Sequence, residues 1–320
     1  MKLCVKELVT NNLVMKKIMI SLAAIFAAVV SVNAQQTVTQ NKDLDKFTEI
    51  KVTDKFSVRL KNSSSYSVSI KSDERIAEYI RPIVKNGVLS FILDEKSYPA
   101  ELKKALKAKG AAEPVLEIDV CMPLLKKLTV EDKAIVLDSD VIAADNFKLS
   151  VEDHAVVNKL FLECGTAELE FSNNSMSNVS VDVNSKIEVE TANSATVNIR
   201  HKGGNGIFAT KGSSVLNLDS ESLELLFETS GSSECFVSGT TSTLCVEASG
   251  SSHIDAEVLD AKDGVFKQTG SCECNVNVVD HIKVDLTGGS TLTFKRKPEI
   301  EVDRIIKSTL IKADDPDRKK

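Results

Sequence analysis

The stretch "ETSGSSECFV" at residues 228–237 returns nineteen residues later as "EASGSSHIDA" at 247–256. Variants of its four-residue centre occur nine times, starting at residues 131, 152, 172, 192, 211, 230, 249, 269 and 287. The spacings between neighbouring copies lie between 18 and 21 residues. A fixed period near 20 residues is typical of a solenoid, in which each repeat forms one coil and stacks on the next.

The second position of this motif indicates a tight turn. Only residue types that tolerate a left-handed backbone occupy it, and glycine does so at least cost. The nine residues, which we call the turn column, are Asp132, Asp153, Asn173, Asn193, Gly212, Gly231, Gly250, Gly270 and Gly288. The fourth position is small in every copy, as a closely stacked corner requires. We therefore expect one turn per coil, with the five glycines required for its backbone conformation.

Between the turns, apolar and polar residues alternate with a period of two, which is typical of strands. Apolar residues recur three positions before each motif, and five and seven positions after it in most coils. These inward columns predict an all-β fold, a right-handed parallel β-helix of about nine coils over residues 128–298, roughly 40 Å long. A left-handed hexapeptide helix is the alternative, but it needs an aliphatic residue every six positions.

The remaining segments divide as follows. Residues 1–34 read as a signal peptide, whose true start is possibly Met15, because a basic start precedes a short apolar run and a small residue at the expected cleavage point. A membrane anchor is the weaker alternative. Residues 35–127 read as a β-rich N-terminal region with one short helix near 97–110. Residues 299–320 form a C-terminal segment and charged tail.

Charge and cysteine content narrow the functional classes. Without residues 1–34 the chain has 36 basic and 45 acidic residues, and the whole sequence has no Trp. We therefore expect no nucleic-acid partner, since such binding needs basic clusters and stacking rings. Six cysteines follow the signal peptide. Cys235 and Cys274 fall on one inward column two coils apart, roughly 10 Å, which is too far for a disulfide. We read them as small core residues, with a disulfide framework as the alternative.

Several stretches resemble a known family, the putative auto-transporter adhesin head GIN domain proteins. They are "FTEIKVTDKFSVRL" at 47–60, "YSVSIKSDERIAEYIRPIVKNGVLSFIL" at 66–93, "VCMPLLKKLTV" at 120–130, the serial "SGSS" turns and "LTGGSTLTFKRKP" at 286–298. The sequence departs from the family pattern in its first two turns, which carry Glu-Asp, and at Arg296, where glycine is frequent. The resemblance implies a right-handed parallel β-helix in an exported protein, periplasmic or at the cell surface. It supplies no catalytic residues.

Two functional classes follow from this architecture. We expect a non-catalytic, adhesin-like binding or cell-envelope scaffold protein without a cofactor, whose partner is a glycan or a cell-envelope protein. The alternative is a carbohydrate-active enzyme, because many polysaccharide lyases and glycosidases are β-helices. The sequence favours the first class, since its four histidines fall at unrelated offsets in the repeat. No outward column combines paired aspartates with a basic residue on neighbouring coils.

One outward column is a candidate polar binding face. Six positions after the motif stand Asn178, Asn198, Asn217, Asp255 and Asn275, interrupted by Phe236. Stacked amides of this kind can bind a glycan or peptide. They can also form an asparagine ladder that only stiffens the strands, and this is the interpretation we favour.

A second outward column carries two further features. Glu168 and Glu188, with Glu170 and Glu190 two residues on, form a square of carboxylates that a hard cation such as Ca²⁺ could bridge. Water, salt and Lys148 suffice equally, and we expect no metal. Farther along, the column becomes apolar at Ile207, Leu226, Cys245 and Val265, which we call the apolar stripe.

An apolar stripe on a strand face needs an explanation, because monomers seldom leave such a surface exposed. We expect the isoleucine-rich segment at 299–311 to fold back and cover it. A partner protein or a homodimer is the second possibility. A local bulge that turns these residues inward is the third.

Overall fold

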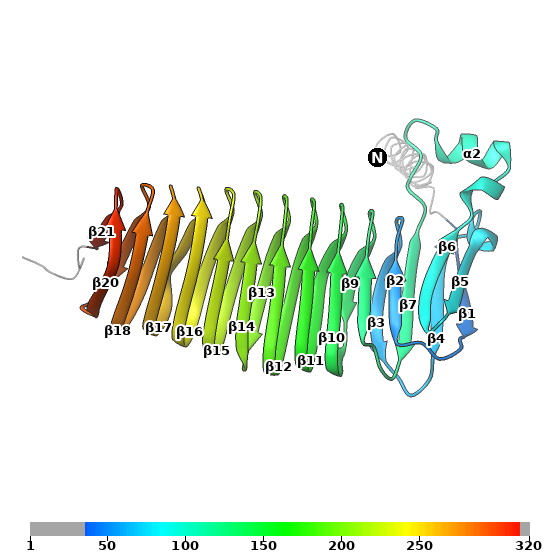
Figure 1. Ribbon diagram of the computed structural model, residues 1–320. Helices are drawn as coiled ribbons and strands as arrows, with labels where there is room; N and C mark the ends of the chain where they lie inside the picture. Colours follow the sequence, from blue (N-terminus) through cyan, green and yellow to red (C-terminus); the bar gives the residue numbers. More distant parts are fainter. Residues whose placement is uncertain (1–35, 314–320) are drawn as a thin grey trace, which may run out of the picture.

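The protein is a rod built from stacked coils, described over residues 36–313 by a computed structural model (Figure 1). The signal peptide expected at 1–34 lies outside these described residues. Within residues 36–313, twenty-one strands form one continuous, coiled sheet. Strands at the front rise toward the tight turns, and the coils wind in a right-handed sense (Figure 1). The predicted parallel β-helix is confirmed.

Each coil contributes one strand segment before its tight turn and one after it. We call the two resulting faces the pre-turn sheet and the post-turn sheet. Neighbouring coils pair in parallel, and several strands run from one turn around the far bend to the next. The repeat strands are β8 (Lys127–Val130), β9 (Ile135–Ser139), β10 (Val141–Val151), β11 (Val156–Phe171), β12 (Met176–Thr191), β13 (Thr196–Lys202), β14 (Asn205–Thr210), β15 (Val215–Thr229), β16 (Glu234–Gly250), β17 (His253–Gly270), β18 (Glu273–Thr287) and β19 (Thr291–Lys295).

The turn column has a left-handed backbone in every coil, with φ between 60° and 104° at all nine residues. Its polar members also bond to one another. Asn173 Nδ2 donates to Asp153 Oδ1 over 3.0 Å, and Asn193 Nδ2 donates to Asn173 Oδ1 over 2.9 Å. Side-chain bonds therefore stabilise the early turns, whereas the later turns rely on glycine.

The solenoid extends beyond residues 128–298 at both ends. Asp54 (φ 58°) forms a further turn between β2 (Glu49–Val52) and β3 (Ser57–Asn62), which pair in parallel with β8 and β9. Lys307 (φ 55°) forms another between β20 (Glu299–Ile306) and β21 (Thr309–Lys312). These strands stack on β18 and β19. The expectation that residues 299–311 fold back over the apolar stripe is therefore wrong, because this segment forms the last coil.

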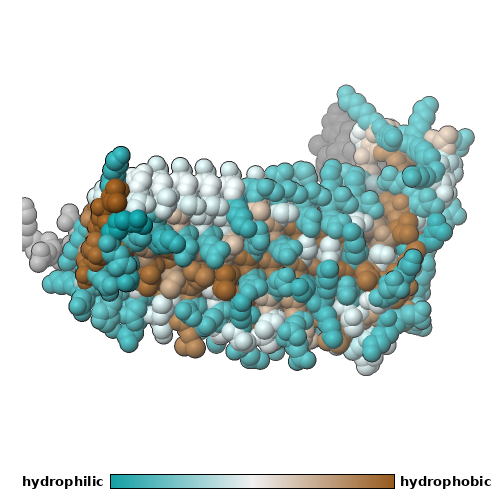
Figure 2. All heavy atoms as spheres, viewed as in Figure 1, coloured by the Kyte–Doolittle hydropathy of each residue, from teal (hydrophilic) through white to brown (hydrophobic). Residues whose placement is uncertain are grey.

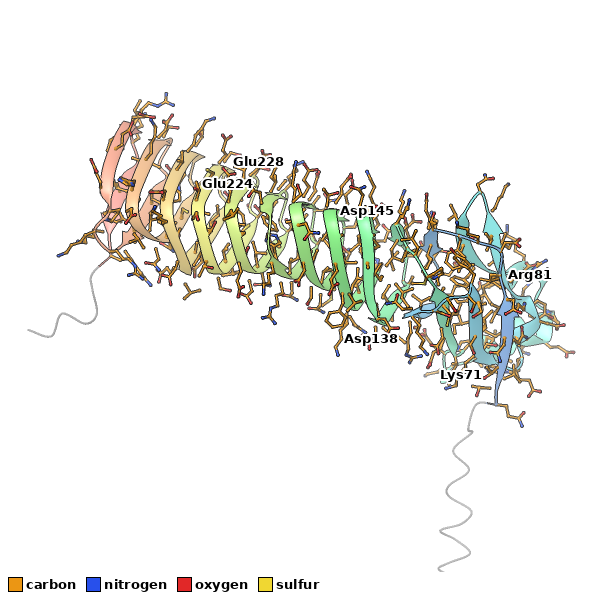
Figure 3. All side chains as sticks on the ribbon, turned by 90° about the horizontal axis from the view of Figure 1, so that it is seen from below. Lys71, Arg81, Asp138, Asp145, Glu224 and Glu228 are labelled. Carbon is orange, nitrogen blue, oxygen red and sulfur yellow. The ribbon has the colours of Figure 1, made fainter. Side chains whose placement is uncertain are left out.

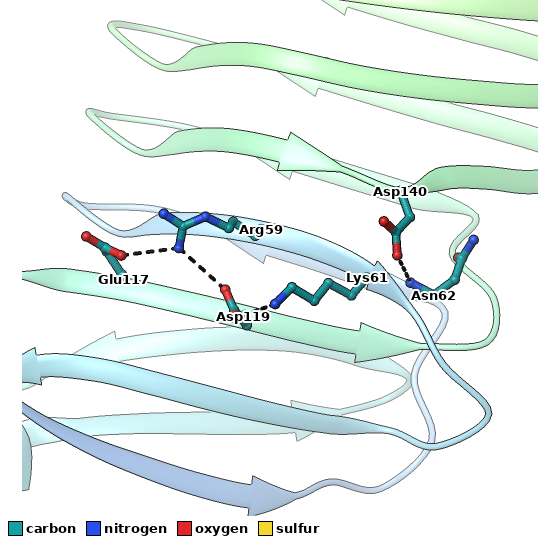
Figure 4. Close-up of polar contacts among 6 residues, drawn as sticks. All are labelled: Arg59, Lys61, Asn62, Glu117, Asp119 and Asp140. Atoms are coloured by element: carbon teal, nitrogen blue, oxygen red, sulfur yellow. Dashed lines mark hydrogen bonds and ion pairs between the residues drawn. The ribbon is translucent and has the colours of Figure 1, made fainter.

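Charged contacts hold the coil at 49–62 against the strand on one side of it (Figure 4). Arg59 contacts Glu117 at 3.2 Å and Asp119 at 3.5 Å, and Lys61 contacts Asp119 at 2.6 Å. These carboxylates belong to β7 (Leu116–Met122), which pairs in parallel with β3. This coil comes first in the sequence. Two strands from later in the sequence pair with β3, β7 on one side and β9 on the other.

Antiparallel strands end the solenoid at its N-terminal side. They are β1 (Thr37–Asp43), β4 (Ser67–Asp73) and β5 (Ile80–Lys85), and β5 pairs with β6 (Val88–Leu93). The short 3-10 helix η1 (Ala77–Tyr79) joins β4 to β5. Between β6 and β7 lie a second 3-10 helix, η2 (Glu95–Ser97), and α2 (Ala100–Leu106), within the range expected for the helix. No helix in residues 36–313 is long and apolar enough to cross a membrane.

The core consists of the inward columns. Phe208 and Phe227 are fully buried on adjacent coils and stack with ring centroids 5.4 Å apart. The six cysteines in the described residues are free thiols. Burial raises the pKa of Cys164 to about 11 and that of Cys235 to about 12, so both thiols stay protonated and pack as small core residues.

One histidine belongs to this core and makes stability depend on pH. His201 is 1% exposed, and its Nδ1 lies 2.9 Å from the Ser220 hydroxyl. Burial lowers its pKa to about 4, whereas an unfolded histidine titrates near 6.5. The unfolded chain therefore binds the additional proton between these values, and the free energy of unfolding falls as the pH falls from about 6.5 to 4.

Val181 occupies the position equivalent to His201 in the preceding coil, so His201→Val is a natural replacement. We expect this substitution to reduce the difference in the free energy of unfolding between pH 7 and pH 5 by about 2 kcal/mol. Urea unfolding at the two pH values measures this difference. His281→Gln is the control, because hydrogen bonding to Asp263 raises the pKa of His281 and gives the opposite sign. An unchanged pH dependence in His201→Val contradicts the prediction.

Candidate functional site

A groove on the post-turn sheet is the candidate binding site. Its volume is about 540 Å³, and it crosses the coils that carry Asn178, Asn198 and Asn217. We call it the ladder groove. Phe161 lines one end, and Phe236 and Val258 line the other. Four coil steps separate Phe161 from Phe236 along the register, so the groove is roughly 19 Å long.

The three asparagines form an amide ladder along the groove. Asn198 Nδ2 donates to Asn178 Oδ1 over 2.7 Å, and Asn217 Nδ2 donates to Asn198 Oδ1 over 2.8 Å. An amide has two N–H donors and two acceptor lone pairs. Each ladder bond uses one donor and one lone pair, so every amide keeps hydrogen-bonding capacity for a ligand.

The other two residues of the expected polar face lie apart from this ladder. Phe236 stands on the coil after Asn217 and interrupts the row of amides. Asp255 lines the groove beyond it and accepts a hydrogen bond from the Glu257 backbone N–H over 3.1 Å. Asn275 pairs with Asp255 on the next coil and does not line the groove.

Two of the three exposed apolar residues, Phe161 and Val258, result from irregular pairing that the repeat period does not reveal, whereas Phe236 lies on the regular outward column. In β11 the register shifts between Val157 and Leu160, so that Leu160 points inward and Phe161 outward. In the pairing of β16 with β17, a second register shift lies between Phe236 and Ser238, and Ser238 then pairs with Val258. The exposed fractions of Phe161, Phe236 and Val258 are 37%, 40% and 71%. Strict alternation from the turn motif predicts Lys159 inward, and Phe161 was therefore missed.

The charges that line the groove balance one another. Arg200 and Asp219 lie side by side on adjacent coils, with Nε and Oδ2 3.9 Å apart. Lys159 and Asp255 add one charge of each sign. The groove thus has apolar ends, amides along its length and no net charge, which suits a neutral ligand better than an acidic or basic polymer.

The apolar stripe lies on the opposite, pre-turn sheet and is visible as a brown band across the coils (Figure 2). Its four residues pair in continuous register, which excludes the third possibility, a local bulge. Ile207, Leu226 and Cys245 are half-buried, and Val265 is 43% exposed. A partner or homodimer at this stripe remains a prediction.

Carboxylates flank the stripe along β15. Glu224 and Glu228 stand two residues either side of Leu226 and point away from the rod (Figure 3). In a dimer whose two-fold axis runs parallel to the coil axis, Glu224 lies opposite Glu228 of the second copy. In a dimer whose two-fold axis runs parallel to the strands, Glu228 lies opposite Glu247 of the second copy. Both arrangements bring like charges together, which disfavours self-association through this stripe.

Three of the four carboxylates in the square are paired with lysines. Lys148 contacts Glu168, Lys186 contacts Glu188, and Lys211 Nζ lies 2.7 Å from Glu190 Oε1. Hydrogen bonding to Glu168 raises the pKa of Lys148. Within residues 36–313, no group of three or more histidine, cysteine, aspartate or glutamate side chains is placed to hold a metal ion.

A known structure shares this architecture. A putative adhesin from Parabacteroides merdae superimposes with a TM-score of 0.50 at 16% identity, over 88% of this chain and 98% of that one. A putative adhesin and a putative lipid binding protein from Parabacteroides distasonis give TM-scores of 0.42 and 0.43, at 15% and 18% identity. Both comparisons cover 88% of this chain and 98% of the other. Curated proteins yield no match.

The family comparison covers most of the described chain. The model of the family described as "Putative auto-transporter adhesin, head GIN domain" matches residues 46–210 and 169–298. These two ranges include the coil at 49–62, the ladder groove and every residue of the turn column. The resemblance seen in the sequence is confirmed, and the chain belongs to the head GIN domain family of putative auto-transporter adhesins.

Proposed function

We propose that the protein is a non-catalytic, exported, adhesin-like solenoid that binds a neutral glycan chain in the ladder groove. The observation that carries this proposal is the row of partly unsatisfied amides between two exposed phenylalanine rings. Sugar hydroxyls pair with amide donors and acceptors, and the apolar faces of sugar rings pack on aromatic rings. Family membership supports the adhesin-like role.

The groove is shaped for binding and lacks the usual geometry of glycosidic hydrolysis. Its two carboxylates, Asp219 and Asp255, lie on different columns two coil steps apart, which separates them by at least roughly 10 Å. Inverting glycosidases place their carboxyl groups about 6.5–9.5 Å apart, and retaining enzymes place them closer. Asp219 is also occupied by its contact with Arg200.

A glycan array probed with the purified protein tests the proposal. We expect neutral glycans of several sugar units to bind, and we expect Phe236→Ala to weaken binding at least tenfold, since it removes the ring at the end of the amide row. Phe161→Ala tests the opposite end of the groove. Isothermal titration with the best array ligand measures both losses.

Leu223→Ala is the matched control, because Leu223 is 67% exposed and does not line the groove. It is expected to leave binding unchanged. Binding that survives both phenylalanine substitutions contradicts the proposed site. Binding to peptides alone on a parallel peptide array contradicts the proposed ligand class.

A further inference from the structure

Among the described residues, 36–313, the C-terminal end of the rod is an open edge of both sheets. β20 pairs with β18 on one side, and no strand within residues 36–313 pairs with its other side. All eight residues of β20 are exposed. Ile300, Val302 and Ile305 continue the inward columns above Ile282, Val284 and Leu286, yet they are 38%, 52% and 39% exposed. An uncovered apolar strand edge of this kind is a template for another strand.

The N-terminal end presents the opposite edges of the same two sheets. β5 is the outermost strand of the pre-turn sheet, and β1 is the outermost strand of the post-turn sheet. The segment around η1 crosses this end, and its own residues Ile76 and Ala77 are buried. Solenoids normally cover their terminal repeats. Within residues 36–313, this segment covers the core at the N-terminal end but leaves the outer edges of β5 and β1 without a paired strand, whereas the C-terminal end is open.

The columns of the two ends match when one rod continues into another. One outward column runs in register through the whole rod, from Lys85 through Val88 and Glu49 to Lys283 and Glu301. A copy stacked on the open end in the same register places its Lys85 beside Glu301. On the neighbouring inward columns, its Val84 meets Val302 and its Pro82 meets Ile305.

The distribution of charge favours this orientation. Residues 36–115 have 15 basic and 11 acidic side chains, whereas residues 116–320 have 21 basic and 34 acidic ones. Lys71 and Arg81 lie at the basic end (Figure 3). At the edges that would meet, β20 has three acidic residues, Glu299, Glu301 and Asp303, and one basic residue, Arg304, whereas β5 has Arg81 and Lys85 and no acidic residue. Lys283 on β18 contacts Glu301 and Asp303 and offsets part of the acidic charge. An acidic edge meeting a basic end steers copies into a head-to-tail contact.

We propose that copies of this protein associate head to tail, with the last coil of one copy stacked on β5 and β1 of the next. β20 then pairs antiparallel with β5, and β21 pairs parallel with β1. This heterologous contact does not close, so repetition extends the rod into a filament. Pro82 has no backbone N–H, so β5 offers fewer backbone bonds and side-chain columns supply more of the specificity.

A charge exchange tests the contact. Analytical ultracentrifugation of the purified protein at increasing concentration and low salt should show masses that pass beyond the dimer. We expect Lys85→Glu to weaken association at least about tenfold, because it places a carboxylate beside Glu301. Adding Glu301→Lys in the same chain restores the opposite charges and should recover the association. Raising the salt concentration should weaken the wild-type contact.

Lys71→Glu is the matched control, since it makes the same charge change at the same end on β4, a strand already paired on both sides. It is expected to leave association unchanged. Circular dichroism establishes that each variant is folded. A single-chain mass at every concentration overturns the proposal. So does growth that stops at a dimer, which indicates a closed pair of C-terminal ends, or an equal loss in Lys71→Glu.

Discussion

Gly250→Val is expected to lower the free energy of unfolding by roughly 2–6 kcal/mol. Gly250 has φ 77°, a region where a β-branched residue is strained. A Cβ added there meets the Gly231 carbonyl oxygen at 2.7 Å and the Gly231 nitrogen at 3.0 Å. The stacked turn below is rigid backbone, so the coils themselves must separate. Urea unfolding followed by circular dichroism measures the loss.

A second glycine separates backbone strain from stacking. Gly87 has nearly the same φ, 78°, but an added Cβ meets nothing within 4 Å. Gly87→Ala therefore reports strain alone, whereas Gly250→Ala reports strain together with the contact between coils. We expect the second substitution to cost more by about 1–3 kcal/mol. Equal losses would show that the turn column tolerates side chains and that stacking at the corner is unimportant.

The repeat in the sequence predicts the solenoid well because its turns repeat a physical requirement. Every position in the turn column needs a left-handed backbone, and only a few residue types accept one. The same reasoning missed the turns at Asp54 and Lys307. Asp54 stands 78 residues before Asp132, because the N-terminal strands and α2 lie between this coil and the coil that stacks on it. Lys307 belongs to a residue type that the column otherwise excludes.

The amide row of the ladder groove could also be predicted, since its spacing follows the period of the coils. The end of the groove formed by Phe161 could not. Phe161 points outward because β11 carries an extra residue after Val157, and a bulge of this kind reverses the face of every residue that follows. Pairing between coils decides where such a bulge lies, and the alternation within one strand does not record it.

Core packing shows the same limit. Phe208 and Phe266 occupy the inward column three residues before the turn, where the sequence predicts apolar side chains. Their rings are accommodated by Gly206 and Gly264, where an added Cβ lies 2.4 Å and 2.5 Å from the ring two residues later. Alternation identifies which residues face inward. It does not reveal which small neighbour makes room for which ring, because that depends on the side-chain rotamers.

Phe227→Ala is expected to destabilise the protein by about 3–5 kcal/mol, since it leaves a cavity in the middle of the rod. Phe227 is fully buried and stacks on Phe208. Solenoid stability is a sum of coil terms and contacts between neighbouring coils, so a defect in a central coil weakens both of its interfaces. Thermal unfolding and hydrogen exchange should show the loss spreading over β14, β15 and β16.

Phe294→Ala is the matched comparison, because Phe294 is 6% exposed and lies one coil from the C-terminal end. Its loss affects the contact with β21 and leaves the central interfaces intact. We therefore expect early exchange confined to β19, β20 and β21, with a smaller change in the main unfolding transition. If both substitutions lower that transition equally, the rod unfolds as one cooperative unit. In that case the open C-terminal coil is as firmly held as the centre, and the rod presents a rigid edge to the next copy.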